Sequence, residues 1–156
     1  ELGEGIEAFS PLFPDNTIEL IRGPQGGQHV NGNMRIVAPG WTQEQLEALQ
    51  AEFFVYDEEG DLASVSVGAF SPKLVEVADS EYTLEFGRFV YMDGLAVYDM
   101  HNTTATYGVE LYTPDGEVME RVQAQVLFVD PALVDVYDEA TQQAVQGIDA
   151  NKVSLR

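Results

Sequence analysis

The chain has 156 residues, a formal net charge of −20 and no cysteine. Its 7 basic residues against 27 acidic ones exclude a nucleic-acid binder or a protein held on an anionic membrane surface, because both need a basic surface. The missing cysteine excludes thiol catalysis, disulfides and cysteine-based metal sites. Apolar residues make up 45% of the chain, enough to build a core, and the length predicts a single domain over residues 1–156.

In the first half of the chain, apolar and polar residues alternate in short runs that end at glycine, proline or acidic clusters, as antiparallel strands do. One of these runs, 62–70, is expected to turn Ala63, Val65 and Val67 to the same face. The predicted strands are 17–22, 28–38, 52–56, 62–70 and 82–86.

One short helix is predicted after Trp41. Thr42 and Gln45 have the spacing of a capping box, and Trp41 and Leu46 occupy the positions of a hydrophobic staple. We expect about two turns, ending near Leu49, which makes this helix a connection between strands.

A hairpin is predicted near the C-terminus, with strands over 106–113 and 117–129. The turn at 114–116 combines a proline, which presets φ, with Gly116, which accepts a left-handed conformation. Polar Glu120 interrupts the apolar face of the second strand, which predicts a β-bulge or a strand overhang.

These elements predict an all-β protein, an immunoglobulin-like antiparallel β-sandwich of about seven or eight strands with one short helix. Residues 1–16 and 136–156 are expected to be extended or frayed. Within the latter segment, 138–145 could form a helical turn and 152–156 an edge strand or a tail.

Two segments carry a family resemblance. The hairpin ATYGVELYTPDGEVMERVQAQVLFVD (105–130) resembles the last two strands of bacterial immunoglobulin-like domains. The segment LIRGPQGGQHV (20–30) is similar to one in exported, lipoprotein-type bacterial proteins, in which a Gly-Pro-Gln-Gly-Gly loop precedes a histidine-containing strand. The resemblance covers 18–130 and implies an immunoglobulin-like fold, but no reaction.

The histidines are candidate catalytic bases. The chain has only two, His29 and His101, and no Gly-x-Ser-x-Gly or comparable nucleophile turn that a Ser-His-Asp site would need. We therefore expect no enzymatic activity.

Copper is one candidate cofactor. Met34 lies five residues after His29, and Met100 directly precedes His101. Imidazole and thioether groups together suit copper, above all Cu(I), because a soft ion prefers sulfur. The GGQHV segment (26–30) resembles a Gly-Gly-x-His segment of periplasmic copper chaperones. The alternative is that the methionines fill the core and the histidines make ordinary hydrogen bonds.

Calcium is the other candidate cofactor, because acidic residues gather at three loops. Calcium takes about six to eight oxygen ligands from a cupped loop. None of the three clusters has the spacing of an EF-hand, and turns favour aspartate in any case. The clusters are Asp57, Glu58, Glu59 and Asp61; Asp93 and Asp99; and Asp115 and Glu117.

Two regions could form a binding surface. One is a candidate ligand-binding loop, because sandwich folds place function in loops at one end. Its residues are Gly23, Pro24, Gln25, Gly26, Gly27 and His29. The other is a set of aromatic residues, although aromatic side chains in strands more often pack in the core or in cross-strand pairs. This set is Trp41, Tyr91, Tyr98, Tyr107 and Tyr112.

The sequence therefore predicts a non-enzymatic, exported binding or surface-structural module, periplasmic or on the cell surface, with a protein or glycan partner. No apolar run reaches the ~20 residues of a transmembrane helix. Because the chain starts at Glu1 without Met, an upstream signal peptide or lipid anchor is expected. The alternative function is a periplasmic copper carrier that uses His29, Met34, Met100 and His101.

Overall fold

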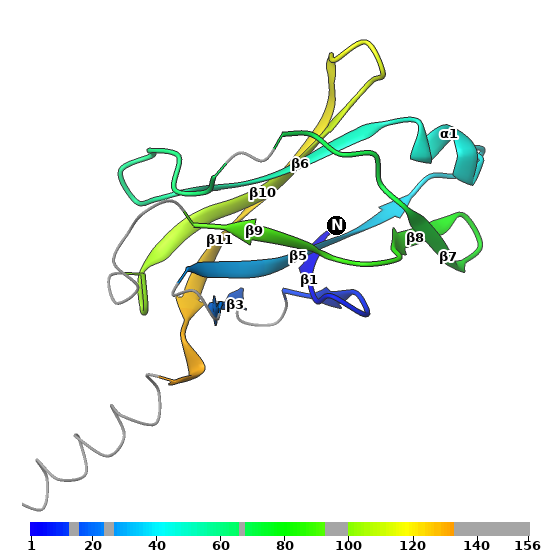
Figure 1. The fold of residues 1–156 in the computed structure, drawn as a ribbon. Coiled ribbons are helices and arrows are strands. Elements are labelled where there is room, and N and C mark those ends of the chain that lie inside the picture. Colours follow the sequence, from blue (N-terminus) through cyan, green and yellow to red (C-terminus); the bar gives the residue numbers. More distant parts are fainter. Residues whose placement is uncertain (13–15, 24–26, 66–67, 93–99, 133–156) are drawn as a thin grey trace, which may run out of the picture.

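The computed structural model describes residues 1–12, 16–23, 27–65, 68–92 and 100–132. Throughout this part of the chain, strands form two sheets that pack against each other, and α1 (Gln43–Glu47) is a short helix (Figure 1). The predicted all-β sandwich with one short helix is confirmed. The same residues contain no helix that is both long enough and apolar enough to cross a membrane. The predictions for 136–156 lie outside the described residues.

The first sheet is organised around β5 (Gln28–Val37), which pairs antiparallel with neighbours on both edges. His29 pairs with Ile21 on one side and with Tyr91 on the other. The other strands of this sheet are β1 (Leu2–Glu4), β2 (Ser10–Pro11), β4 (Ile21–Arg22), β7 (Leu74–Ala78), β8 (Glu81–Leu84) and β9 (Arg88–Tyr91).

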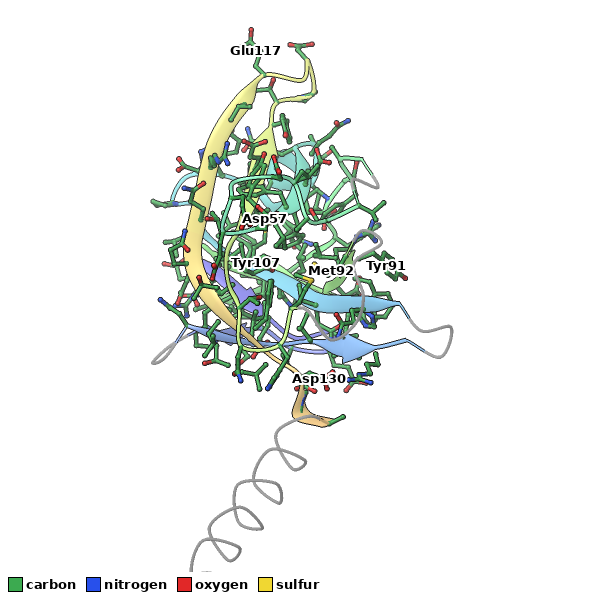
Figure 2. All side chains as sticks on the ribbon, turned by 90° about the vertical axis from the view of Figure 1, so that its left-hand side faces the viewer. Asp57, Tyr91, Met92, Tyr107, Glu117 and Asp130 are labelled. Carbon is green, nitrogen blue, oxygen red and sulfur yellow. The ribbon has the colours of Figure 1, made fainter. Side chains whose placement is uncertain are left out.

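The second sheet has the order β3-β11-β10-β6 and is built on the predicted C-terminal hairpin. Leu111 pairs with Glu120 and Tyr112 pairs with Val118, so Met119 is an extra residue next to the bulge position that the sequence indicated. Figure 2 shows Glu117 at the tip of this hairpin and Asp130 beyond its other end. The strands are β3 (Thr17–Glu19), β6 (Gln50–Tyr56), β10 (Thr104–Tyr112) and β11 (Val118–Val129).

The single strand predicted over 17–22 is in fact two strands in different sheets. β3 pairs parallel with β11 in the second sheet, whereas β4 pairs with β5 in the first. Between them lies Leu20, which is buried and whose amide donates to the Val129 carbonyl at 2.8 Å. The chain therefore passes from the second sheet to the first at Leu20, and this residue links the two sheets.

The strand predicted over 62–70 is also wrong as a continuous element. The described residues of this segment form only isolated bridges, at Leu62, Ser64 and Phe70. Ser64 is buried, and its hydroxyl accepts the Val55 amide at 3.0 Å, while Val65, expected on the inner face, is exposed. The described residues contain eleven strands rather than seven or eight. The sequence pattern predicted β3 and β4 as one strand, and it did not predict several of the short strands.

The helix begins as predicted. The Thr42 hydroxyl accepts the Gln45 amide at 3.2 Å, and the Gln45 side chain accepts the Thr42 amide at 2.9 Å, which completes the capping box. Leu46 is buried in the core. The helix ends at Glu47, two residues earlier than expected, with Ala48 as its C-cap.

Tyr107 of β10 joins the two sheets through the core. Its ring is fully buried and stacks on Phe53 at a centroid distance of 6.0 Å, and its hydroxyl donates to the Gly3 carbonyl of the opposite sheet at 3.2 Å. Burial raises the pKa of Tyr107 well above its ordinary value, because the phenolate would lose its hydration. Gly32 of β5 faces the ring, and a Cβ atom there would lie 2.8 Å from the Tyr107 hydroxyl.

We predict that Gly32→Ala lowers the free energy of unfolding by about 1–3 kcal/mol, because the added methyl overpacks the core. A Cβ at Gly32 would also approach Val90 at 3.0 Å and Phe53 at 3.2 Å. Urea denaturation followed by tryptophan fluorescence measures the change.

The matched control is Gly27→Ala, because a Cβ at Gly27 would meet nothing within 4 Å. Adding Tyr107→Phe to Gly32→Ala removes the closest clashing atom, so the double variant should lose less stability than the two single losses combined. Equal stability of Gly32→Ala and Gly27→Ala would contradict this account of the core.

Candidate functional site

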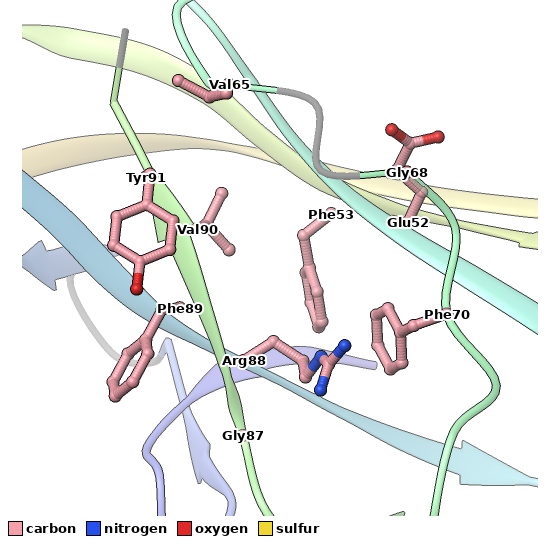
Figure 3. Close-up of a pocket in the computed structure, with 10 residues that line it drawn as sticks. All are labelled: Glu52, Phe53, Val65, Gly68, Phe70, Gly87, Arg88, Phe89, Val90 and Tyr91. Atoms are coloured by element: carbon pink, nitrogen blue, oxygen red, sulfur yellow. The ribbon is translucent and has the colours of Figure 1, made fainter.

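A cleft opens at the edge of the sandwich between β9 of the first sheet and β6 of the second. Its volume is about 360 Å³, at the small end of the range for ligand pockets. Residues 68–70 form the wall opposite β9 (Figure 3). The described residues that line the cleft are Glu52, Phe53, Val65, Gly68, Phe70, Gly87, Arg88, Phe89, Val90 and Tyr91.

The floor of the cleft is apolar and belongs to the core. Phe53 and Val90 are buried there, and Phe53 stacks on Phe70 at a centroid distance of 6.2 Å. Arg88 reaches from β9 toward Phe70, and its guanidinium carbon lies 4.1 Å from the ring centroid (Figure 3). This cation–π contact lies across the cleft and links its two walls.

The rim of the cleft carries exposed apolar side chains. Phe89 is 48% exposed, Tyr91 45% and Val65 41%. Strand alternation explains the two aromatic residues: Val90 points into the core, so its neighbours on β9 point out. Scattered exposed apolar residues are ordinary, but a group of them beside a cleft is a candidate interaction site.

His29 of β5 extends this aromatic rim. It pairs directly with Tyr91, and its ring meets Phe89 edge to face at 4.7 Å and Tyr91 at 5.8 Å between centroids. Burial against these rings lowers the pKa of His29, because it removes water from the imidazolium form. His29, Phe89 and Tyr91 are called the aromatic rim below.

The predicted ligand-binding loop is only partly described. The Gly23 amide donates to the Gly27 carbonyl at 2.7 Å and so closes the turn between β4 and β5. Pro24, Gln25 and Gly26 lie outside the described residues. His29, the last member of the predicted loop, belongs to the aromatic rim.

The candidate copper ligands do not share one face. His29 and Met34 lie five residues apart on β5, which places them on opposite faces of the strand. Met34 and Met100 are both buried in the core cluster. An ion held by the histidines and these methionines together would require the core to open.

His101 contacts Asp130, the residue that follows β11. Its Nδ1 accepts the Asp130 amide at 3.0 Å, and the buried Asp130 carboxylate accepts Arg22 Nε at 2.7 Å. These bonds connect β4 with the end of β11, so the described contacts of His101 are structural.

The acidic loop at 57–61, one candidate calcium site, uses its carboxylates within the fold. Asp57 accepts the Asp61 amide at 2.8 Å. Glu58 accepts the amide and the hydroxyl of Thr104 at 3.1 and 2.7 Å, and these bonds lower its pKa. Asp93 and Asp99 lie outside the described residues. Within the described ranges, no three His, Asp or Glu side chains are grouped to hold a metal ion.

The other predicted aromatic residues have different surroundings. Tyr107 is a core residue, Tyr112 donates to Glu110, and Trp41 is exposed beside α1. Tyr98 lies outside the described residues.

Sequence reasoning singled out Tyr91 but not Phe89 or Arg88, because it did not predict β9. The available signal was the run of aromatic and β-branched residues at 89–91, which favour strands.

Comparisons of the chain with protein-family models, with curated proteins and with solved structures give no match.

We predict that the His29 imidazole titrates below its ordinary pKa of about 6.5 in an NMR titration, because the aromatic rim desolvates it. Phe89→Ala exposes the ring and should move the pKa of His29 back up. Phe86→Ala, which truncates an aromatic residue that is 62% exposed and has no described contact with His29, is the control. An unchanged pKa in Phe89→Ala would show that Phe89 does not bury the imidazole.

Proposed function

We propose that this chain is a non-enzymatic binding module that holds an extended peptide segment of a partner protein in the cleft beside β9. The observation that carries the proposal is the placement of two exposed aromatic residues, Phe89 and Tyr91, next to an apolar cleft. We further propose, from the sequence, that the module is exported and acts in the periplasm or at the cell surface.

The residue types at the cleft support binding. Aromatic residues and arginine are enriched among the residues that dominate interface energies. The floor residue Phe53 also stacks on the buried Tyr107, so it is held in place before any ligand arrives. A preformed floor lowers the ordering cost of binding.

The charge of the chain favours a basic partner segment. The net charge is −20, and Glu52 is the acidic side chain among the described residues that line the cleft. Arg88 is the basic side chain among the same described residues, and it packs on Phe70. A lysine or arginine of the partner next to Glu52 would be attracted both by this carboxylate and by the long-range negative field of the chain.

A peptide is favoured over a glycan by the geometry of the rings. The planes of Phe89 and Tyr91 are inclined at 58°, so together they do not form one flat platform for a sugar ring. Catalysis is not favoured, because the described lining offers no nucleophile beside a base.

The proposal predicts that selection from a phage-displayed random peptide library on the immobilised chain enriches peptides with apolar and basic residues. Phe89→Ala should weaken the binding of a selected synthetic peptide at least about tenfold in isothermal titration calorimetry, the usual effect of truncating an interface aromatic. Phe86→Ala, outside the cleft lining, should leave the affinity unchanged.

Two results would contradict the proposal. One is a selection in which no peptide is enriched over an empty surface. The other is a selected peptide that binds wild type and Phe89→Ala equally well, since such a peptide does not use the cleft. Binding to a glycan array with no peptide enrichment would replace the peptide by a glycan.

A further inference from the structure

We infer that the partner segment binds by adding a short strand to the edge of β9 at Phe89. This inference rests on the proposed function above and adds the mode of recognition: main-chain hydrogen bonds from β9 supply affinity, and the cleft and aromatic rim select side chains.

The hydrogen bonds of β9 show which of its main-chain groups face the cleft. The Met92 amide donates to the Gln28 carbonyl of β5 at 2.9 Å, whereas the Tyr91 carbonyl accepts the Val65 amide at 2.8 Å on the other side. Main-chain groups alternate in direction along an antiparallel strand. Val90 therefore faces β5, and the amide and carbonyl of Phe89 face away from it.

Within the described part of the chain, the outward amide and carbonyl of Phe89 form no hydrogen bond. The two neighbouring positions are different: the Tyr91 carbonyl is taken by Val65, and the Gly87 amide donates to the Ile6 carbonyl at 2.8 Å. The open stretch is thus short and centred on Phe89, between two tethered points.

Two other strand edges, those of β7 and β6, are less open to pairing. β7 is interrupted by a register shift between Glu76 and Ala78, which makes it a poor template. The outer edge of β6 is partly bonded, since Ala51 exchanges two 2.8 Å hydrogen bonds with Phe70 and the Val55 carbonyl accepts the Ala63 amide at 2.8 Å. At Phe89 the edge instead borders the cleft and the aromatic rim.

The occupant that fits this site is an extended segment of a different, basic protein. A strand added to β9 would lie about 4.8 Å from it and would point alternate side chains to opposite faces. One set would enter the cleft over Phe53, and the other would contact the aromatic rim. A second copy of this chain fits less well, because two chains of net charge −20 repel each other.

The test is a methylation scan of the peptide selected for the cleft. Single N-methylation removes one main-chain amide at a time. Among the described residues of β9, Phe89 supplies the open main-chain carbonyl, so one peptide amide can donate to this edge. We therefore expect a loss of affinity of about tenfold when that amide is methylated, and little change at the amides on either side of it, which point away from β9.

Hydrogen exchange on the protein, measured by NMR, gives an independent readout. In the free chain the Phe89 amide should exchange much faster than the Val90 amide, which faces β5. Saturating peptide should slow exchange at Phe89 by more than tenfold, while Val90, already paired, serves as the internal control.

The outcomes distinguish a failure of strand addition from a failure of the proposed peptide binding. One methylation-sensitive amide between two tolerant neighbours, together with slowed exchange at Phe89, supports strand addition. A peptide that loses affinity in Phe89→Ala but tolerates methylation throughout, or leaves Phe89 exchange unchanged, overturns strand addition and leaves the proposed function standing. A selection that enriches no peptide overturns both.

Discussion

The close approach of Tyr107 to the glycines of the opposite sheet is the constraint on which the rest of the sandwich depends. The buried phenol extends from β10 to the Gly3 carbonyl, and the missing side chain of Gly32 leaves room for it. An interior packed at this density transmits any added volume to its neighbours. Because Gly32 also pairs with Glu4 on one side and Arg88 on the other, the same point sets the positions of β1 and β9.

The cleft is a consequence of how these two sheets end. β9 and β6 lie at the edges of different sheets, and the described part of 62–70 bridges them only through isolated contacts. Phe53 belongs to both regions, since it stacks on Tyr107 in the core and on Phe70 in the cleft. The binding surface that we propose is therefore built on the buried core, which limits the entropy lost when a partner binds.

Local signals predicted the elements that depend on local interactions. The capping box at Thr42, the turn before Glu117, the bulge near Glu120 and the long strand at 28–38 all appear in the structure, because a cap, a turn residue or a sustained period of two acts over a few neighbouring residues. The segment 17–22 has the same kind of pattern, yet it divides between two sheets at Leu20. A period of two reports which side chains are buried, here Ile18 and Leu20. Both lie in the one core that the two sheets share, so the pattern does not reveal the change of sheet that follows β3.

By itself the sequence determined the class of the fold, the strong negative charge, the absence of cysteine chemistry and the position of the C-terminal hairpin, since these follow from composition and local pattern. Only the tertiary structure decided which residues share a surface. It buried Met34 and Met100, bonded His101 to Asp130 and brought His29 beside Phe89 and Tyr91, which lie some 60 residues further along the chain. Contacts of that separation depend on strand register and sheet packing, and these arise from the simultaneous burial of the whole core, which no single segment encodes.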